Sequence, residues 1–104
     1  MKRIIIYGND FQYDYIRKEI KEYIISENSL KINKVIIDLL DKEQFRGQKA
    51  NVAFCLDKNV DEDTYAYLSA ATVRLEDNSK GNFTSDKAII CDMEELVSLL
   101  KLFE

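Results

Sequence analysis

The chain has 104 residues, of which 46% are hydrophobic and 33% are charged, a balance typical of one soluble globular domain spanning residues 1–104. It contains no histidine, which excludes histidine-based catalytic triads and metal sites that need imidazole. The net charge of −4 is unevenly distributed: residues 1–50 carry ten basic and eight acidic side chains, whereas residues 51–104 carry five and eleven. The acidic second half argues against nucleic-acid binding, because that binding needs Lys and Arg to displace counterions.

The amino-terminal segment and the two cysteines predict a cytoplasmic protein without a membrane segment. The apolar run Ile4–Tyr7 is too short for a signal peptide or a membrane-spanning helix, and no small-residue cleavage site follows it. In the cytoplasm, Cys55 and Cys91 stay reduced. They stand thirty-six residues apart outside any C-x-x-C motif, so we interpret them as buried strand thiols rather than zinc ligands or a redox pair.

In chain order, the first half predicts two buried strands that flank a long amphipathic helix. Short β-branched runs indicate strands at Arg3–Tyr7 and Lys34–Leu40. Between them, apolar residues recur at helical spacing, which predicts a helix from Asp10 to about Glu27. Its apolar stripe contains Phe11, Ile16, Ile20, Tyr23 and Ile24. After the second strand, we expect one or two helical turns in Asp41–Gln48.

The second half predicts two further helices and less regular strands. The expected elements are a strand at Asn51–Leu56, a helix at Asp61–Ala71, a one-sided strand at Thr72–Glu76, a strand at Lys87–Cys91 and a closing helix at Met93–Phe103. The polar segment between the last two strands, residues 77–86, is short for a parallel crossover. These two strands could therefore be antiparallel.

These elements predict a three-layer α/β domain with about five mostly parallel strands and helices on both faces, for which a flavodoxin- or receiver-like topology is one possibility. Four apolar runs end at Asn or Asp with Gln or Glu three residues later, which is the pattern of a helix capping box. The pairs are Asn9 with Gln12, Asp41 with Gln44, Asn59 with Glu62, and Asp92 with Glu95. Helix capping is therefore a structural explanation for many of the carboxylates in this chain.

The strongest candidate for a ligand site is a crevice at the carboxyl ends of the first three strands. Gly8, Asn9 and Asp10 follow the first strand, and Asp57 follows the third. Ligands bind at this edge of open parallel sheets. Asp10 and Asp57, with an acidic residue after the second strand, could hold Mg²⁺. Gly8 lacks the further glycines or the Gly-Lys-Ser/Thr of nucleotide-binding loops, so no other cofactor is predicted.

In two elements the chain resembles response-regulator receiver domains. Gly8-Asn9-Asp10 corresponds to the acidic residues after the first strand of that family, and Cys55-Leu56-Asp57 to its phosphoacceptor aspartate after the third. The resemblance implies Mg²⁺ and phosphate binding by Asp10 and Asp57. The chain departs from the family at Glu76-Asp77, where a receiver has Ser or Thr, and at Cys91-Asp92, where it has Lys. We assign the chain to no family on these two elements.

The closing helix has more apolar residues than a core-facing stripe requires. At 100° per residue, that stripe contains Met93, Leu96, Val97, Leu100 and Phe103. Leu99 lies at its margin, and Leu102 lies on the opposite face near Glu94 and Glu95. We expect these last four residues to form part of an interface with a protein partner or with a second copy of the chain.

Three functional interpretations follow. The favoured one is a small, non-catalytic interaction or regulatory protein that binds another protein. The second is a receiver-like domain that binds Mg²⁺ and phosphate through Asp10 and Asp57. The third is a small-molecule sensor that uses the crevice at Gly8-Asn9-Asp10 together with residues 77–86. No catalytic motif supports enzymatic activity, and the sequence leaves that question open.

Overall fold

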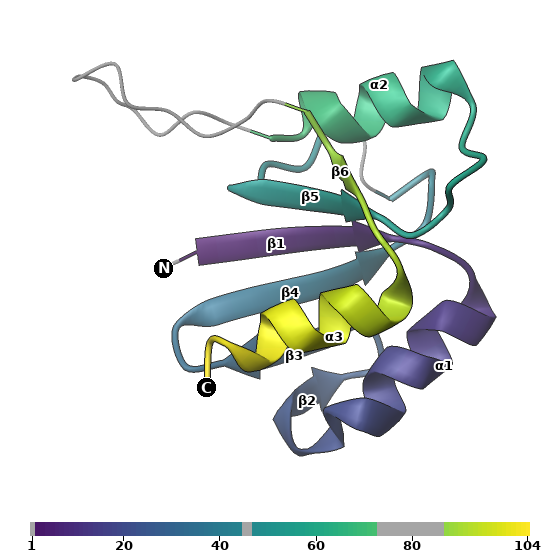
Figure 1. Cartoon of the computed structure of the whole chain (residues 1–104). Coiled ribbons are helices and arrows are strands. Elements are labelled where there is room, and N and C mark those ends of the chain that lie inside the picture. Colours follow the sequence, from purple (N-terminus) through teal and green to yellow (C-terminus); the bar gives the residue numbers. More distant parts are fainter. Residues whose placement is uncertain (1, 45–46, 73–86) are drawn as a thin grey trace.

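The computed structural model describes residues 2–44, 47–72 and 87–104, which form one mixed sheet flanked by α-helices (Figure 1). Within these residues, the sheet has six strands in the order β2-β3-β4-β1-β5-β6. The strands are β1 (Lys2–Tyr7), β2 (Ile24–Ser26), β3 (Ser29–Ile32), β4 (Val35–Leu40), β5 (Val52–Cys55) and β6 (Ile89–Ile90). The helices are α1 (Asp10–Glu19), α2 (Glu62–Ala70), α3 (Met93–Lys101) and the short 3-10 helix η1 (Lys21–Tyr23). No helix in this part of the chain is long and apolar enough to cross a membrane.

Strand β1 is the centre of the sheet and pairs with a parallel strand on each side. Ile4 is opposite Ile37 of β4 and Val52 of β5. Strands β5 and β6 are also parallel. Ile5 and Ile6 are completely buried. This burial on both faces explains why the sequence of β1 is a continuous apolar run without polar alternation. The prediction that the first three apolar runs form parallel strands is confirmed.

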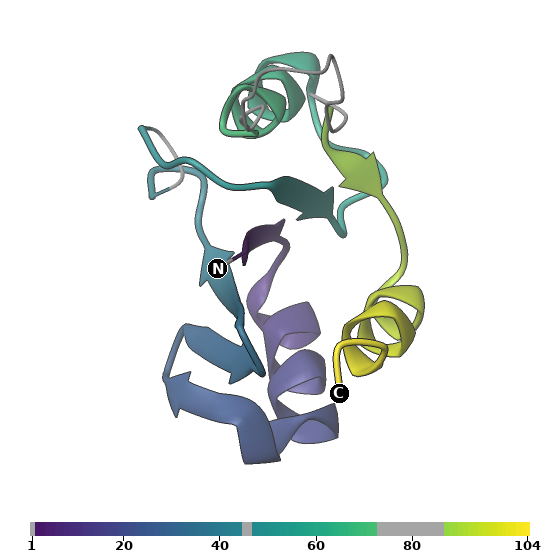
Figure 2. The same ribbon diagram turned by 90° about the vertical axis from the view of Figure 1, so that its left-hand side faces the viewer.

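Helices cover both faces of the sheet, as predicted. Figure 2, viewed roughly along the strands, shows α2 on one side of the sheet and α1 with α3 on the other. Side chains of neighbouring strand residues alternate between these two layers. Ile4 and Ile6 belong to the larger core, which contains buried residues of α1 and α3, whereas Ile5 packs in the smaller core with Leu68 of α2.

The predicted helix from Asp10 to Glu27 is wrong in its second half. Helix α1 ends at Glu19, and the chain then forms an antiparallel hairpin, β2–β3, which pairs antiparallel with β4. Leu30 and Ile32 are buried on either side of exposed Lys31, the alternation of a strand with one covered face. The hairpin therefore makes the sheet mixed and six-stranded rather than mostly parallel with about five strands.

Two features hold this hairpin in place. The Nε of Arg17 donates to the carbonyl oxygen of Glu27 at 2.8 Å, which connects α1 to the hairpin turn. Asn33 adopts a φ of 54° between β3 and β4, a left-handed conformation in which Asn is enriched. The Arg17 bond therefore connects the β2–β3 turn to α1, and Asn33 accommodates the turn between β3 and β4.

Two of the four predicted capping boxes are confirmed. The Asn9 side chain accepts from the N–H of Gln12 at 2.8 Å, while Gln12 accepts from the N–H of Asn9 at 2.9 Å. Asp92 and Glu95 form the equivalent box at the start of α3, in which Glu95 accepts from the N–H of Asp92 at 2.9 Å. Each box satisfies backbone donors that the first helical turn leaves unpaired.

The other two capping pairs were predicted wrongly. Helix α2 begins after Asp61 rather than after Asn59, and the Asp61 carboxylate accepts from the N–H of Thr64 at 3.0 Å and from its hydroxyl at 2.7 Å. Gln44 does accept from the N–H of Asp41 at 2.8 Å, but residues 42–44 form a turn and not a helix. Apolar residues that would pack a helix against the sheet are missing from this short segment.

The region around the predicted fourth strand is described only in part. Thr72 forms an isolated parallel bridge with Ala50. The rest of the strand expected at Thr72–Glu76, and the segment 77–86, lie outside the described residues. The strand expected at Lys87–Cys91 is present as the shorter β6, at the edge of the sheet next to β5.

Two substitutions at the start of α1 test whether Asn9 is the cap of this helix. Replacing Asn9 by Ala should lower the free energy of unfolding by about 0.5–2 kcal/mol, because an N–H of the first turn loses its acceptor. Asp10→Ala removes only a charge near the helix dipole and should cost less, about 0.3–1 kcal/mol. Urea denaturation of both variants measures the difference. A larger loss for Asp10→Ala would contradict the cap.

Candidate functional site

Tyr13 fixes the carboxyl end of β1. Its hydroxyl is buried, accepts a hydrogen bond from the N–H of Gly8 at 2.8 Å and donates to the carbonyl oxygen of Leu40 at 2.7 Å. The carbonyl oxygen of Ile6 lies 3.1 Å away. One side chain of α1 thus joins the ends of β1 and β4 and the loop that follows β1. Burial raises the pKa of Tyr13 above its ordinary value, so the hydroxyl stays protonated.

A polar hollow of about 350 Å³ opens at the carboxyl ends of β1 and β5. It is lined by Tyr7, Gly8, Asn9, Gln12, Leu56, Asp57, Lys58 and Asn59. The chain leaves β1 toward β4 on one side and leaves β5 toward β6 on the other. The loops after these two strands therefore separate, and the crevice between such loops is the usual ligand position in open α/β sheets.

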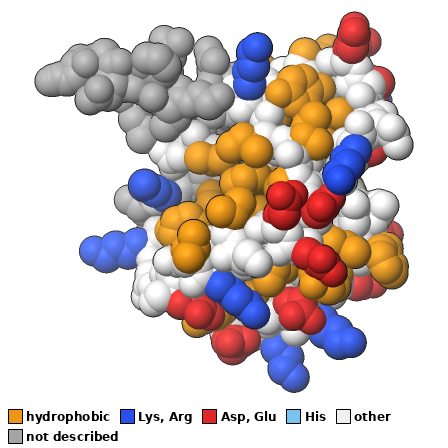
Figure 3. Space-filling view, in the orientation of Figure 1, with side chains coloured by type: hydrophobic (Ala, Val, Ile, Leu, Met, Phe, Trp, Pro, Cys, Tyr) orange, Lys and Arg blue, Asp and Glu red, His pale blue; other side chains and the backbone are white. Residues whose placement is uncertain are grey.

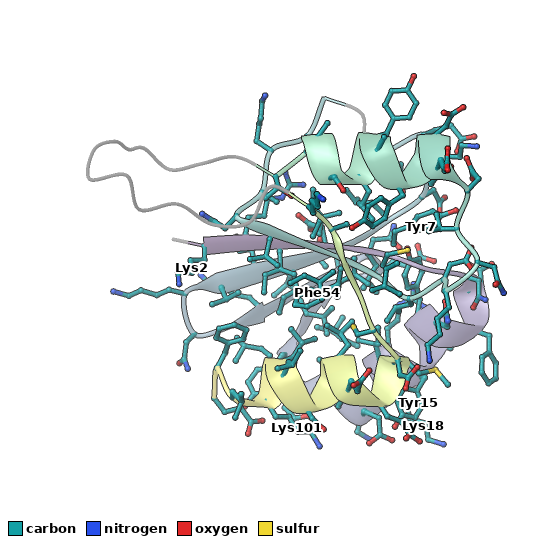
Figure 4. The ribbon with its side chains drawn as sticks, turned by 45° about the horizontal axis from the view of Figure 1, so that its top comes forward. Lys2, Tyr7, Tyr15, Lys18, Phe54 and Lys101 are labelled. Carbon is teal, nitrogen blue, oxygen red and sulfur yellow. The ribbon has the colours of Figure 1, made fainter. Side chains whose placement is uncertain are left out.

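A second hollow of about 380 Å³ adjoins the first and reaches α3. The two hollows share the walls formed by Gln12, Leu56 and Lys58. Asp92, Met93 and Glu94, at the start of α3, complete the second one. Figure 4 shows Lys2 and Tyr7 at opposite ends of β1, so both hollows lie at the Tyr7 end of the sheet.

The predicted crevice residues are divided between the hollow and open solvent. Gly8, Asn9 and Asp57 line the first hollow, whereas Asp10 is exposed on the first turn of α1 and lines neither hollow. The Asp57 carboxylate accepts from the N–H of Asn59 at 2.9 Å. Among the described residues, no group of three or more His, Cys, Asp or Glu side chains is arranged to hold a metal ion.

The acidic residues in and after β4 also lie outside the hollows. Asp38 lies within β4 and binds the Nε of Arg3 at 2.7 Å. Asp41 belongs to the turn after β4, where its backbone N–H donates to Gln44, and it lines neither hollow. The carboxylates that follow the strands therefore do not converge on the hollow as the sequence alone suggests.

The sequence analysis missed Gln12 and Lys58 as wall residues. Lys58 carries the only positive charge in the two linings, opposite three carboxylates, and its Nζ lies 2.6 Å from the Asp92 carboxylate. This ion pair raises the pKa of Lys58, but both side chains are exposed, so its contribution to stability is small. The adjacency of Lys58 to Asp57 after a buried strand is the sequence signal that could have identified it.

The two cysteines are buried and free, as the sequence analysis interpreted them. They lie on neighbouring strand segments, where the N–H of Cys91 donates to the carbonyl oxygen of Cys55 at 3.0 Å. Their side chains pack in different cores on opposite faces of the sheet. Burial raises the pKa of both thiols, that of Cys91 to about 11. Neutral, buried thiols are poor nucleophiles.

The predicted interface residues are exposed on α3 and, for Leu102, at its C-cap. Leu102 is 79% exposed and Leu99 is 40% exposed, whereas the core-facing Leu96 and Leu100 are completely buried. Glu94 and Glu95 are also exposed. The predicted distribution of these side chains around the helix is therefore present in the structure.

Hydrophobic side chains also gather on the surface between β6 and α3 (Figure 3). Four of the partly or fully exposed apolar residues on the bordering segments are Val52, Ile89, Leu99 and Phe103, and we call these four residues the apolar surface. Ile89 is opposite Phe54 in the register of β5 and β6, so it points to the face that carries α3. Ile89 was not predicted as a surface residue, because an apolar residue in a predicted strand is expected to be buried.

Side chains of α2 bind the backbone of Ala88, the residue that precedes β6. The Tyr65 hydroxyl donates to the carbonyl oxygen of Ala88 at 2.6 Å, and the N–H of Ala88 donates to Ser69 Oγ at 2.8 Å. These bonds fix the start of β6 to α2.

Comparison of the chain with protein-family models, curated proteins and solved structures found no match.

Replacing Tyr13 by Phe tests the hydrogen bonds at the end of β1. The variant should lose about 1–3 kcal/mol of unfolding free energy, because it leaves buried backbone groups without a partner. Tyr15→Phe, on the same helix, is the matched control, since the Tyr15 hydroxyl makes no hydrogen bond within the described ranges. Urea unfolding compares the two, and equal losses would contradict the role of Tyr13.

The same variant has a pH signature. The unfolded chain releases the Tyr13 proton near pH 10, but the folded protein retains it because its pKa is raised. The contribution of Tyr13 to the free energy of unfolding is fully present below about pH 10 and decreases as the pH rises above that value. Stability of the Tyr13→Phe variant should therefore fall less steeply above pH 10 than that of the wild type.

Proposed function

We propose that the chain is a non-catalytic interaction domain that binds another protein through the apolar surface and the adjoining α3. The observation that carries the proposal is the gathering of exposed apolar side chains between β6 and α3, where the helices leave part of the sheet uncovered (Figure 3). Contiguous exposed apolar surface rimmed by polar residues is characteristic of protein–protein contact sites.

The surroundings of the apolar surface support the same function. Asp92, Glu94 and Glu95 provide an acidic border at the amino-terminal end of α3. Apolar centres with a charged rim are the usual anatomy of binding surfaces, in which the rim orients the encounter and the centre supplies affinity.

Substitution within the apolar surface tests the proposal. The tagged wild-type chain and its Ile89→Lys variant would be used as baits in low-salt pull-downs from the native host, with mass spectrometry of the bound proteins. Ile89→Lys should remove one stoichiometric partner, since a charge in the contact must be desolvated. Stability should stay within about 0.5 kcal/mol of wild type.

Ile25→Lys is the matched control, because Ile25 is 58% exposed on β2 at the opposite edge of the sheet. The control should retain the partner. A partner that survives Ile89→Lys, or that is lost equally from both variants, would contradict binding through the apolar surface.

A second candidate function is binding of a small polar molecule in the hollow at the carboxyl ends of β1 and β5. The position of this hollow, between loops that diverge from adjacent parallel strands, favours it. Three carboxylates face a single lysine in the two linings, so a cationic or neutral ligand suits the charge better than a free phosphate does. Mg²⁺ is the simplest probe of the receiver-like form of this function.

If Asp57 contributes to a Mg²⁺ site, millimolar Mg²⁺ should raise the melting temperature by mass action. Asp57→Asn should abolish the increase, while Asp10→Asn would reveal whether the exposed carboxylate takes part. Asp63→Asn, on the exposed surface of α2, serves as the control. Absence of any Mg²⁺-dependent shift in the wild type would eliminate the receiver-like function.

A further inference from the structure

Strands β3 and β4 have one face that no helix of the described residues covers. Helix α2 packs over β1 and β5, and Figure 2 shows β3 and β4 without a helix on that side of the sheet. In the strand register, Lys31 of β3, Ile36 of β4 and Arg3 of β1 form one row. Arg3 and Ile36 precede Ile4 and Ile37, which pack in the larger core, so the row lies on the opposite, uncovered face.

Basic residues adjoin this row where β1, β4 and β5 begin. The N–H of Lys2 donates to the carbonyl oxygen of Lys34 at 3.2 Å, and Nη1 of Arg3 donates to the carbonyl oxygen of Lys49 at 3.1 Å. The four lysines, with Lys31, are exposed, and Figure 3 shows basic side chains at the left-hand edge, where these strands begin. We call Lys2, Arg3, Lys31, Lys34 and Lys49 the basic face.

Arg3 is oriented by hydrogen bonds within the basic face. Its Nε donates to the Asp38 carboxylate at 2.7 Å, in addition to the bond from Nη1 to Lys49. The Asp38 carboxylate also accepts from the Ser29 hydroxyl, and the Asp38 side chain is mostly buried. A guanidinium has five N–H donors, so these two bonds hold the group in place and leave donors for a further acceptor.

We propose that the basic face binds a short acidic segment of a partner protein, with Arg3 as the anchor for one carboxylate. This surface is distinct from the apolar surface, and the inference does not depend on the proposed function. Charge complementarity carries it: four lysines surround Arg3, and none of the four forms an ion pair with another described residue. An oriented guanidinium is suited to two-point binding of a carboxylate.

The extent of the basic face limits the length of the segment. From β3 to β5 the face crosses three inter-strand spacings, about 14 Å, which is the length of about four extended residues. Beyond Lys34, the Asn33 side chain donates to the carbonyl oxygen of Glu104 at 3.2 Å, so an acidic residue borders the face there.

The chemistry of the basic face favours carboxylates over nucleic acid. Single-stranded nucleic acids bind proteins through bases stacked on aromatic rings, and neither the basic face nor Ser29 and Ile36 beside it supplies an aromatic side chain. The net charge of −4 would also repel a long polyanion that extends past this face. A short acidic segment meets the positive charges alone.

Fluorescence anisotropy of a labelled oligoglutamate peptide, titrated with the full chain at low salt, tests the proposal. The wild type should bind the peptide, and added salt should weaken the binding by screening. The double variant Lys31→Glu/Lys34→Glu should weaken binding by about tenfold, because two attractions become two repulsions. Arg3→Lys keeps the charge but loses the planar donor group, so it should weaken binding by about fivefold.

The double variant Lys18→Glu/Lys42→Glu is the matched control, because it reverses two exposed lysines outside the basic face and should bind like the wild type. Circular dichroism would verify that each variant is folded. A wild type that does not bind oligoglutamate, or a control that loses as much affinity as Lys31→Glu/Lys34→Glu, would overturn the proposal. Tighter binding of an oligothymidylate of equal charge would overturn the choice of an acidic protein segment, and wild-type affinity of Arg3→Lys would overturn the anchor.

Discussion

The burial of β1 on both faces and along both edges is the constraint from which the rest of the structure follows. A strand that pairs with parallel neighbours on each side must be covered by connections that cross the sheet, so α1 and α2 lie on opposite faces. Its carboxyl end then becomes the point where the loops after β1 and β5 diverge. Tyr13 stabilises this point through the hydrogen bonds of one buried hydroxyl.

The second hollow and the exposed face of α3 adjoin at the amino-terminal end of this helix. Asp92 caps this helix and pairs with Lys58, one of the three residues that both hollows share. Glu94 lines the second hollow and also lies on the outer face of α3.

The sequence predicted best those features that depend on local chemistry or continuous burial. Ile4–Tyr7 is apolar throughout because both of its faces are covered, and the pairing of Asn9 with Gln12 is a reciprocal hydrogen-bond pattern that needs no tertiary partner. The hairpin was missed because Ile20, Tyr23 and Ile24 continue the helical spacing of α1. Burial of Leu30 and Ile32 against the larger core, a tertiary effect, decides in favour of strands there.

Only those residues of the candidate site that directly follow a strand could be predicted from the sequence. Gly8, Asn9 and Asp57 follow directly from the positions of β1 and β5, and they do line the hollow. Asp10 was placed with them because it is adjacent in sequence, but the first turn of α1 directs it to solvent. Ile89 could not be identified as exposed, because its exposure depends on α3 leaving the sheet uncovered beside β6.

Native-state hydrogen exchange tests the central role of β1 most directly. The amides of Ile5 and Ile6 should exchange only through global unfolding, with an opening free energy equal to that from denaturation, while amides of the edge strand β2 exchange through smaller openings. That result would show that β1 is the last element to separate from the fold. Exchange of Ile5 and Ile6 as fast as that of Ile25 in β2 would contradict the account.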